Sequence, residues 1–107
     1  MSANDTTKAI IVYLTKIKKC LAFRVNSGRV LVGGGGKKYA YQGAPTGTSD
    51  IIGCLPDGRF LAIEVKQEDK LSEEQIVFIN SVIEKGGVAF VAHSVTECMD
   101  MLEAAGY

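Results

Sequence analysis

The stretch that most limits how this chain can fold is residues 49–67, SDIIGCLPDGRFLAIEVKQ, where two apolar runs surround Pro56-Asp57-Gly58. Pro and Asp favour the central positions of a type I turn, and Gly58 supplies the left-handed residue that closes a three-residue hairpin loop. The stretch therefore predicts two antiparallel strands. Apolar residues occupy both faces of this hairpin, which is typical of central strands that are covered on both sides.

The turn also determines which residues of the two strands pair. With this loop, Ile51 pairs with Ile63, and Asp50 falls opposite Glu64. Directly opposed side chains lie about 5 Å apart at Cβ. Two carboxyl groups at that separation repel each other and raise each other's pKa unless a cation lies between them. We therefore expect a cation at this end of the hairpin.

Two further groups fall beside the acid pair. Because side chains alternate along a strand, Lys66 emerges on the face of Glu64, whereas Val65 points into the core and leaves its backbone carbonyl free to reach a cation. The carboxylates of Asp50 and Glu64 and the Val65 carbonyl form a hard-oxygen site suited to Mg²⁺ or Mn²⁺. A lysine beside such a metal can orient the attacking water or neutralise charge that develops on phosphorus. These groups are the minimum for phosphodiester hydrolysis; the ordinary alternative is a strand-end Lys66 paired with Glu64 or Glu68.

The chain before the hairpin predicts one helix and two strands. Apolar residues at helical spacing indicate a helix from Thr6 to about Cys20, capped by Asn4 or Asp5. Its buried stripe is expected to contain Ile10, Leu14, Ile17 and Leu21. Residues 23–32 predict a strand, a turn at 26–28 and a second strand. Residues 33–47 form a long glycine-rich segment, which we expect to be a loop.

The chain after the hairpin predicts a helix, a strand and a helix. Ser72 and Gln75 match a capping box at the start of a helix that the glycines at 86–87 end. Its buried stripe is expected to contain Ile76, Ile79, Val82 and Ile83. Residues 88–92 form a short buried strand, and Ser94 caps a final helix that runs to about Ala105. The order α-β-β-β-β-α-β-α, with a right-handed crossover, predicts an α/β fold whose mixed central sheet is flanked by helices.

The composition fits one globular domain over residues 1–107, with 47% apolar residues. Such a content argues against disorder. The longest apolar stretches are too short to cross a bilayer, and no signal-peptide pattern opens the chain. The three cysteines are widely spaced among apolar neighbours, which is typical of reduced core residues in a cytosolic protein. We therefore expect a cytoplasmic location and no membrane partner.

The net charge of zero hides an uneven distribution. Residues 1–49 carry eight Lys or Arg against one Asp, whereas residues 50–107 carry four Lys or Arg against eleven Asp or Glu. This asymmetry favours a basic face for a polyanion, the alternative being solvated surfaces that happen to differ. The GGGGKK sequence at 33–38 fails the P-loop pattern, and a basic loop along a nucleic-acid backbone fits it better. The candidate nucleic-acid contacts are Ser49, Arg24, Arg29, Lys37 and Lys38.

The order Asp50, then Glu64-Val65-Lys66, on adjacent strands resembles the D…(D/E)xK signature of the PD-(D/E)xK superfamily of restriction-endonuclease-like nucleases. The segments NSGR, GTSDIIG, EVKQ…LSEEQIVFINSVIEKGGVAFV and SVTECMDML are similar to the virus-type replication-repair nuclease (VRR-NUC) domain, from about residue 6 to residue 102. The resemblance implies a restriction-endonuclease-like core in which Asp50 and Glu64 bind divalent metal and Lys66 assists catalysis. It also implies that Gln75 sits beside the site.

The activity that this resemblance implies is metal-dependent endonuclease cleavage of branched or otherwise structured DNA, leaving a 5′-phosphate. Stand-alone members of the family are small viral or prophage proteins, similar in role to Holliday-junction resolvases that act in DNA repair. Cutting two strands implies a homodimer with one site per subunit, in the cytoplasm of a bacterial host cell.

One departure from the family pattern concerns the first helix. Family members usually carry a metal-associated Glu there, whereas Asp5 is the nearest acid in this chain and Thr6 and Thr7 follow it. Either Asp5 substitutes, or fewer protein ligands hold the metal. The departure motivates an alternative, a structured-DNA-binding module with a lapsed active site. A third possibility is a purely structural subunit of a larger assembly.

Overall fold

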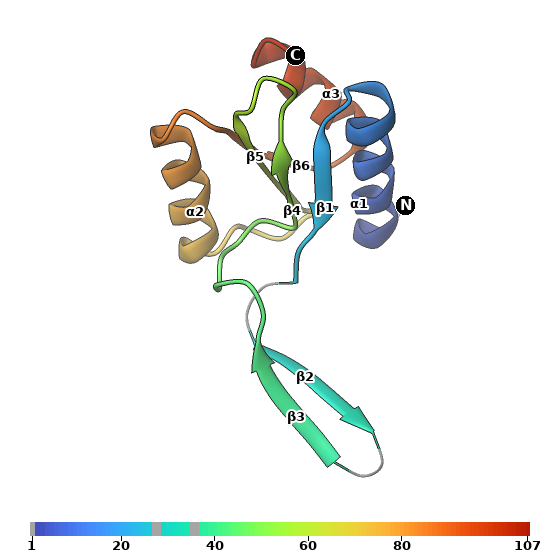
Figure 1. Cartoon of the computed structure of the whole chain (residues 1–107), viewed down its shortest axis with the longest axis vertical. Helices are drawn as coiled ribbons and strands as arrows, with labels where there is room; N and C mark the ends of the chain where they lie inside the picture. Colours follow the sequence, from blue (N-terminus) through green and yellow to red (C-terminus); the bar gives the residue numbers. More distant parts are fainter. Residues whose placement is uncertain (1, 27–28, 35–36) are drawn as a thin grey trace.

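A four-stranded mixed sheet forms the centre of the molecule, and a separate two-stranded hairpin extends from it (Figure 1). The computed structural model describes the backbone of residues 2–26, 29–34 and 37–107 and the side chains of residues 2–26 and 43–107. The sheet strands are β1 (Leu21–Arg24), β4 (Ile51–Cys54), β5 (Phe60–Val65) and β6 (Val88–Ala92), in the order β1-β4-β5-β6. β4 is antiparallel to both of its neighbours, β1 and β5, whereas β6 is parallel to β5.

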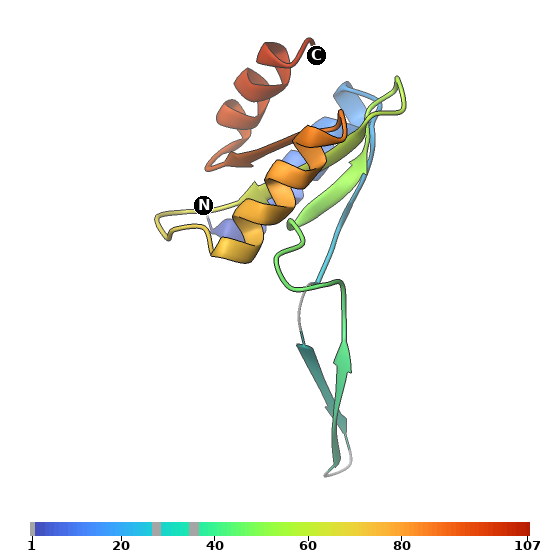
Figure 2. The same cartoon turned by 90° about the vertical axis from the view of Figure 1, so that its left-hand side faces the viewer.

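Helices cover both faces of this sheet, as the sequence predicts. Helices α1 (Ala3–Val12) and α3 (Val95–Ala104) lie on one face, and α2 (Glu73–Glu84) lies on the other (Figures 1 and 2). The main core lies between the sheet and the α1–α3 layer. Its fully buried side chains include Ile10, Leu14, Ile51, Leu61, Ile63, Cys98 and Leu102. None of the helices in the described part of the chain has the length and apolar character needed to cross a bilayer.

The β4–β5 hairpin has the predicted register. Ile51 pairs with Ile63, and the Leu55 amide donates to the Arg59 carbonyl at 2.9 Å across the loop. Gly58 has a φ of 91°, the left-handed conformation that the loop requires. The turn chemistry alone was therefore sufficient to fix the pairing of these strands.

The first helix begins earlier than predicted. Ser2, rather than Asn4 or Asp5, is the N-cap, because its hydroxyl accepts from the Asp5 amide at 3.1 Å. The helix consequently starts at Ala3 instead of Thr6. Ser, Asn and Asp are all favourable N-cap residues, so residue type alone did not distinguish Ser2 from Asn4 and Asp5.

The second half of this helix also differs, because a π-helix, η1 (Tyr13–Ile17), follows α1. The wider turn changes the direction in which later side chains point. Ile10 and Leu14 are fully buried as expected, but Ile17 is 67% exposed. Leu21 lies in β1 and is also exposed. The predicted stripe is thus wrong beyond Leu14.

The strands between residues 21 and 42 pair differently from the prediction. β1 pairs with β4, and β2 (Arg29–Gly34) pairs with β3 (Lys37–Gln42). The glycine-rich segment therefore contains a strand where a loop was expected, and the order gains one strand. Alternating tyrosines at 39 and 41 favour extended backbone, a signal that the glycines obscured. Of the predicted turn at 26–28, residues 27–28 lie outside the described residues.

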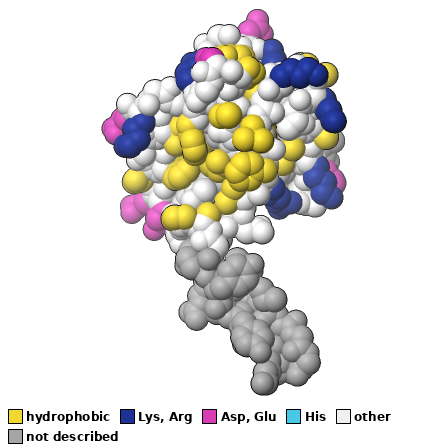
Figure 3. Space-filling view, in the orientation of Figure 1, with side chains coloured by type: hydrophobic (Ala, Val, Ile, Leu, Met, Phe, Trp, Pro, Cys, Tyr) yellow, Lys and Arg dark blue, Asp and Glu magenta, His cyan; other side chains and the backbone are white. Residues whose placement is uncertain are grey.

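Helix α2 begins at the predicted capping box but buries only half of the predicted stripe. Ile79 and Val82 are buried, whereas Ile76 and Ile83 are exposed. The main packing of α2 is against β5 and β6, and it covers Ile79 and Val82 but not Ile76 and Ile83. Exposed apolar side chains consequently remain on this side of the sheet, and Figure 3 shows them gathered beside α2.

Candidate active site

The two acids of the hairpin lie at its open end. Asp50 immediately precedes β4, and the register that pairs Ile51 with Ile63 places Asp50 opposite Glu64. This is a non-hydrogen-bonded pair position, where opposed side chains approach most closely. Asp50 Oδ2 accepts a hydrogen bond from the Val65 amide at 2.8 Å. The Asp50 carboxylate thus replaces a ladder bond and is fixed against β5.

Glu64 is a buried acid in an unfavourable environment. Its side chain is 2% exposed. Burial, followed by the hydrogen bond and negative charge of Asp50, raises the pKa of Glu64 to about 8, while the charge of Lys66 acts in the opposite direction. A carboxyl group with this pKa is mostly protonated at neutral pH unless a cation stabilises its ionised form.

The two oxygens of Glu64 are not equivalent. Oε1 accepts from Gln75 Nε2 at 3.1 Å. Oε2 is buried and has no hydrogen-bond partner among the described residues. An unpartnered buried carboxylate oxygen is costly, and a bound cation would provide the missing interaction.

Gln75 connects this acid to the start of α2. Its side-chain Oε1 accepts a hydrogen bond from the Ser72 backbone amide at 2.9 Å, and its backbone amide donates to Ser72 Oγ at 3.2 Å. Its Nε2 is thereby directed at Glu64. The structural role of Gln75 as a capping residue and its predicted position beside the site therefore coexist in one side chain.

Lys66 pairs with a residue that the sequence analysis missed. Its Nζ lies 3.0 Å from Asp69 Oδ2, so the ordinary alternative, a strand-end lysine paired with Glu64 or Glu68, named the wrong partner. Lys66 is largely covered, whereas Asp69 is exposed and its pKa is lowered, first by the hydrogen bond from Lys66. No periodic pattern marks the loop after β5, so only the spacing of three residues could have suggested this pair.

The predicted nucleic-acid contacts fall into three groups. Ser49 is fully buried, and its Oγ has no hydrogen-bond partner within the described chain; in this conformation the hydroxyl is covered and does not reach a surface. Arg24 is exposed at the end of β1 and donates to Asn4 Oδ1. The remaining candidates have side chains outside the described residues: Arg29, Lys37 and Lys38.

The described residues fit a divalent cation held by few protein ligands. Asp5 is exposed, and Thr6 and Thr7 are buried. No three His, Cys, Asp or Glu side chains within the described ranges are grouped closely enough to hold a metal, so Asp5 does not join the acid pair. The remaining set is the two carboxylates, with Glu64 Oε2 unpartnered, together with the predicted third ligand, the Val65 carbonyl; all are hard oxygens. Such a set fits Mg²⁺ or Mn²⁺ with the other positions filled by water and substrate.

An acid before one central strand, an acid at the end of the next and a lysine two residues later, on a mixed sheet covered by helices, define the PD-(D/E)xK class of nucleases. The VRR-NUC domain profile matches residues 17–96. The chain therefore belongs to the VRR-NUC family, and it carries a nuclease domain that acts on DNA. A search of curated proteins finds no match to this chain.

Proposed function

We propose that this protein is a Mg²⁺- or Mn²⁺-dependent DNA endonuclease that cuts branched or otherwise structured DNA in the cytoplasm. The observation that best supports metal dependence is Glu64, a buried acid beside Asp50 with its pKa raised to about 8 and one oxygen unpartnered among the described residues. A divalent cation would remove the repulsion between these acids and satisfy that oxygen.

Each residue of the site has a proposed role. Asp50, Glu64 and the Val65 carbonyl would hold the ion, which when bound would supply an activated water and stabilise charge on the phosphate. Gln75 orients Glu64 through its hydrogen bond to Oε1. Lys66 exchanges Asp69 for a phosphate oxygen and neutralises the charge that develops during attack. The expected product carries a 5′-phosphate.

The test uses a labelled four-way junction, a linear duplex of equal length, and Mg²⁺, Mn²⁺ or EDTA. We expect cleavage of the junction with either metal, and a loss of at least a hundredfold in rate for Asp50→Asn and Glu64→Gln. Glu103→Gln, which removes an exposed charge from α3 on the other face of the sheet from α2, is the matched control and should retain activity. Equal, metal-independent behaviour of all variants would refute the proposal.

The alternative is a DNA-binding module with a lapsed active site. In the described part of the first helix, no acid lies close enough to Asp50 and Glu64 to share a metal ion with them. This absence favours the binding module. Calorimetric titration of Mn²⁺ into wild type and Glu64→Gln separates the two functions. Negligible binding to both proteins, together with retained DNA binding, would favour the module.

We also propose a homodimer, since a resolvase must cut two strands. Strand β1 is an edge of the sheet, and its Leu21 and Phe23 are exposed, as are Val12 and Ile17 of the first helical segment. Exposed apolar residues on an edge strand and an adjacent helix are suited to a subunit interface.

A further inference from the structure

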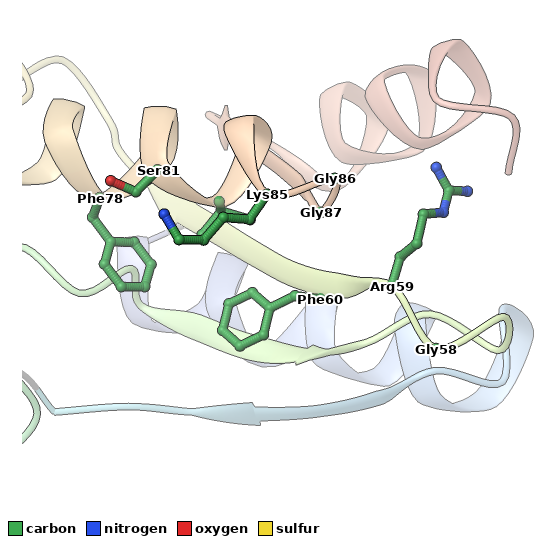
Figure 4. A pocket seen from close by; sticks show the side chains of 9 residues that line it. Gly58, Arg59, Phe60, Phe78, Ser81, Lys85, Gly86 and Gly87 are labelled. Atoms are coloured by element: carbon green, nitrogen blue, oxygen red, sulfur yellow. The ribbon is translucent and has the colours of Figure 1, made fainter.

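A pocket of about 460 Å³ lies between the start of β5 and the last turns of α2, at the opposite end of β5 from the acids (Figure 4). Phe60 of β5 and Phe78 of α2 both contribute aromatic rings to it. Gly87 lets the chain after α2 pass close to β5, because a Cβ there would lie 2.7 Å from Val82 Cγ1 and 2.9 Å from the Phe60 carbonyl oxygen. The pocket is therefore aromatic, and a glycine forms part of its wall.

The charges around this pocket favour an anion. Among the described residues, its lining contains Arg59 and Lys85 and no acid. Arg59 is already paired with Asp57 at 2.9 Å. Lys85 is exposed and has no ion pair among the side chains that the structure describes. A ligand with an aromatic body and one negative charge is complementary to the two rings and this lysine.

The pocket and the acids share one face of β5. Phe60 and Glu64 are four residues apart, so their side chains point to the same side of the sheet. Four residues of strand span about 13 Å. This distance corresponds to about four stacked nucleotides at 3.4 Å each. A DNA strand with one phosphate at Glu64 is long enough to reach the pocket.

We infer that this pocket binds an unpaired nucleobase of the DNA substrate, stacked against Phe60 and Phe78, with the adjoining phosphate on Lys85. The inference rests on the proposed nuclease function and narrows its substrate to DNA that has an unpaired base near the cleaved bond. Bases within a duplex are covered on both faces by their neighbours, so only an unstacked base can enter the pocket. Base–aromatic stacking also tolerates any base, which suits recognition of structure over sequence.

The test measures binding of two hairpin DNAs of equal length in EDTA, with 2-aminopurine either in a single-base bulge or base-paired. Wild type should quench the bulged probe and bind it more tightly. Phe60→Ala should weaken binding of the bulged DNA about tenfold, within the range for loss of one stacked base, and change binding of the paired DNA less than twofold. Lys85→Gln should weaken binding and reduce the salt dependence by about one phosphate contact.

Ile83→Ala is the control, since Ile83 is exposed on the same helix but does not line the pocket; it should bind both DNAs as wild type does. Phe60 is 44% exposed, so its replacement should leave the circular dichroism spectrum and melting temperature unchanged. An equal loss for both DNAs in Phe60→Ala, or no loss, would overturn the inference. If the wild type is a dimer and Phe60→Ala is a monomer, the surface around Phe60 contacts a second subunit. This result would also overturn the inference. If the protein cuts the junction but binds the bulged and paired DNAs equally, only the base-binding role of the pocket is refuted. If it binds no DNA at all, the nuclease proposal is refuted as well.

Discussion

At the scale of single residues, Glu64 combines burial, an adjacent acid and an unpartnered oxygen. Each of these would destabilise a protein that had no use for the ionised carboxylate. Their coincidence on one side chain is typical of a functional site, where groups are held in environments that perturb their pKa.

The raised pKa of Glu64 predicts a stability that depends on pH. Its ordinary pKa of 4.5 rises to about 8 in the folded protein, so the folded state binds more protons between these values. The stabilising contribution of Glu64 to the free energy of unfolding is therefore complete below about pH 4.5 and is lost as the pH rises through 8. In EDTA, urea denaturation should show a decrease in the free energy of unfolding of a few kcal/mol from pH 5 to pH 9. Glu64→Gln should flatten this decrease; an equally steep decrease in that variant would contradict it.

The Lys66–Asp69 ion pair predicts competition between Asp69 and DNA. In metal-free binding assays, Asp69→Asn should bind DNA about threefold more tightly, because a phosphate no longer displaces a carboxylate from Lys66. Glu68→Gln removes one charge from the adjacent exposed residue, for which the described side chains provide no ion pair. It should have a smaller effect. Equal gains in both variants would indicate that only net charge matters.

At the scale of elements, the N-terminus of α2 joins helix capping to the site. Ser72→Ala should lower stability by about 1 kcal/mol through loss of the cap. It should also weaken Mn²⁺ binding about tenfold, because without the bond from the Gln75 backbone amide to Ser72 Oγ the first turn of α2 frays and no longer holds the Gln75 side chain towards Glu64.

Ser94 provides a matched control, since its hydroxyl caps α3 by accepting from the Glu97 amide at 3.1 Å. Ser94→Ala should cost similar stability, measured by urea denaturation, without changing Mn²⁺ affinity in calorimetry. Equal losses of affinity in the two variants would show that the effect comes from stability alone.

The elements also show what could be predicted from sequence. Local rules determined the β4–β5 register and the caps of α2 and α3, because a turn or cap needs only three or four consecutive residues. The facing of Asp50 and Glu64 followed directly from that register. The π-helix after Val12 was not predictable from apolar spacing, which assumes one period throughout. The pairing of β1 with β4 depended on contacts distant in sequence, and the Lys66–Asp69 pair depended on an irregular loop.

At the scale of the whole molecule, the exposed edge of the sheet predicts assembly through β1. Leu21→Asp should convert a dimer to a monomer in light scattering, because a charge at this exposed apolar position would be buried in the interface. Val77→Asp replaces an equally exposed apolar residue on α2 and should leave the dimer intact. A wild-type monomer at all concentrations would remove the dimer from the proposal.

β5 is hydrogen-bonded along both of its edges, to β4 and to β6. A strand held in this way cannot lengthen or shorten, so the span between its ends is constant. If a DNA substrate is bound at both ends of β5, the incision falls a constant number of nucleotides from the base bound in the pocket. Products cut from branches of different sequence would then share one uniform overhang length.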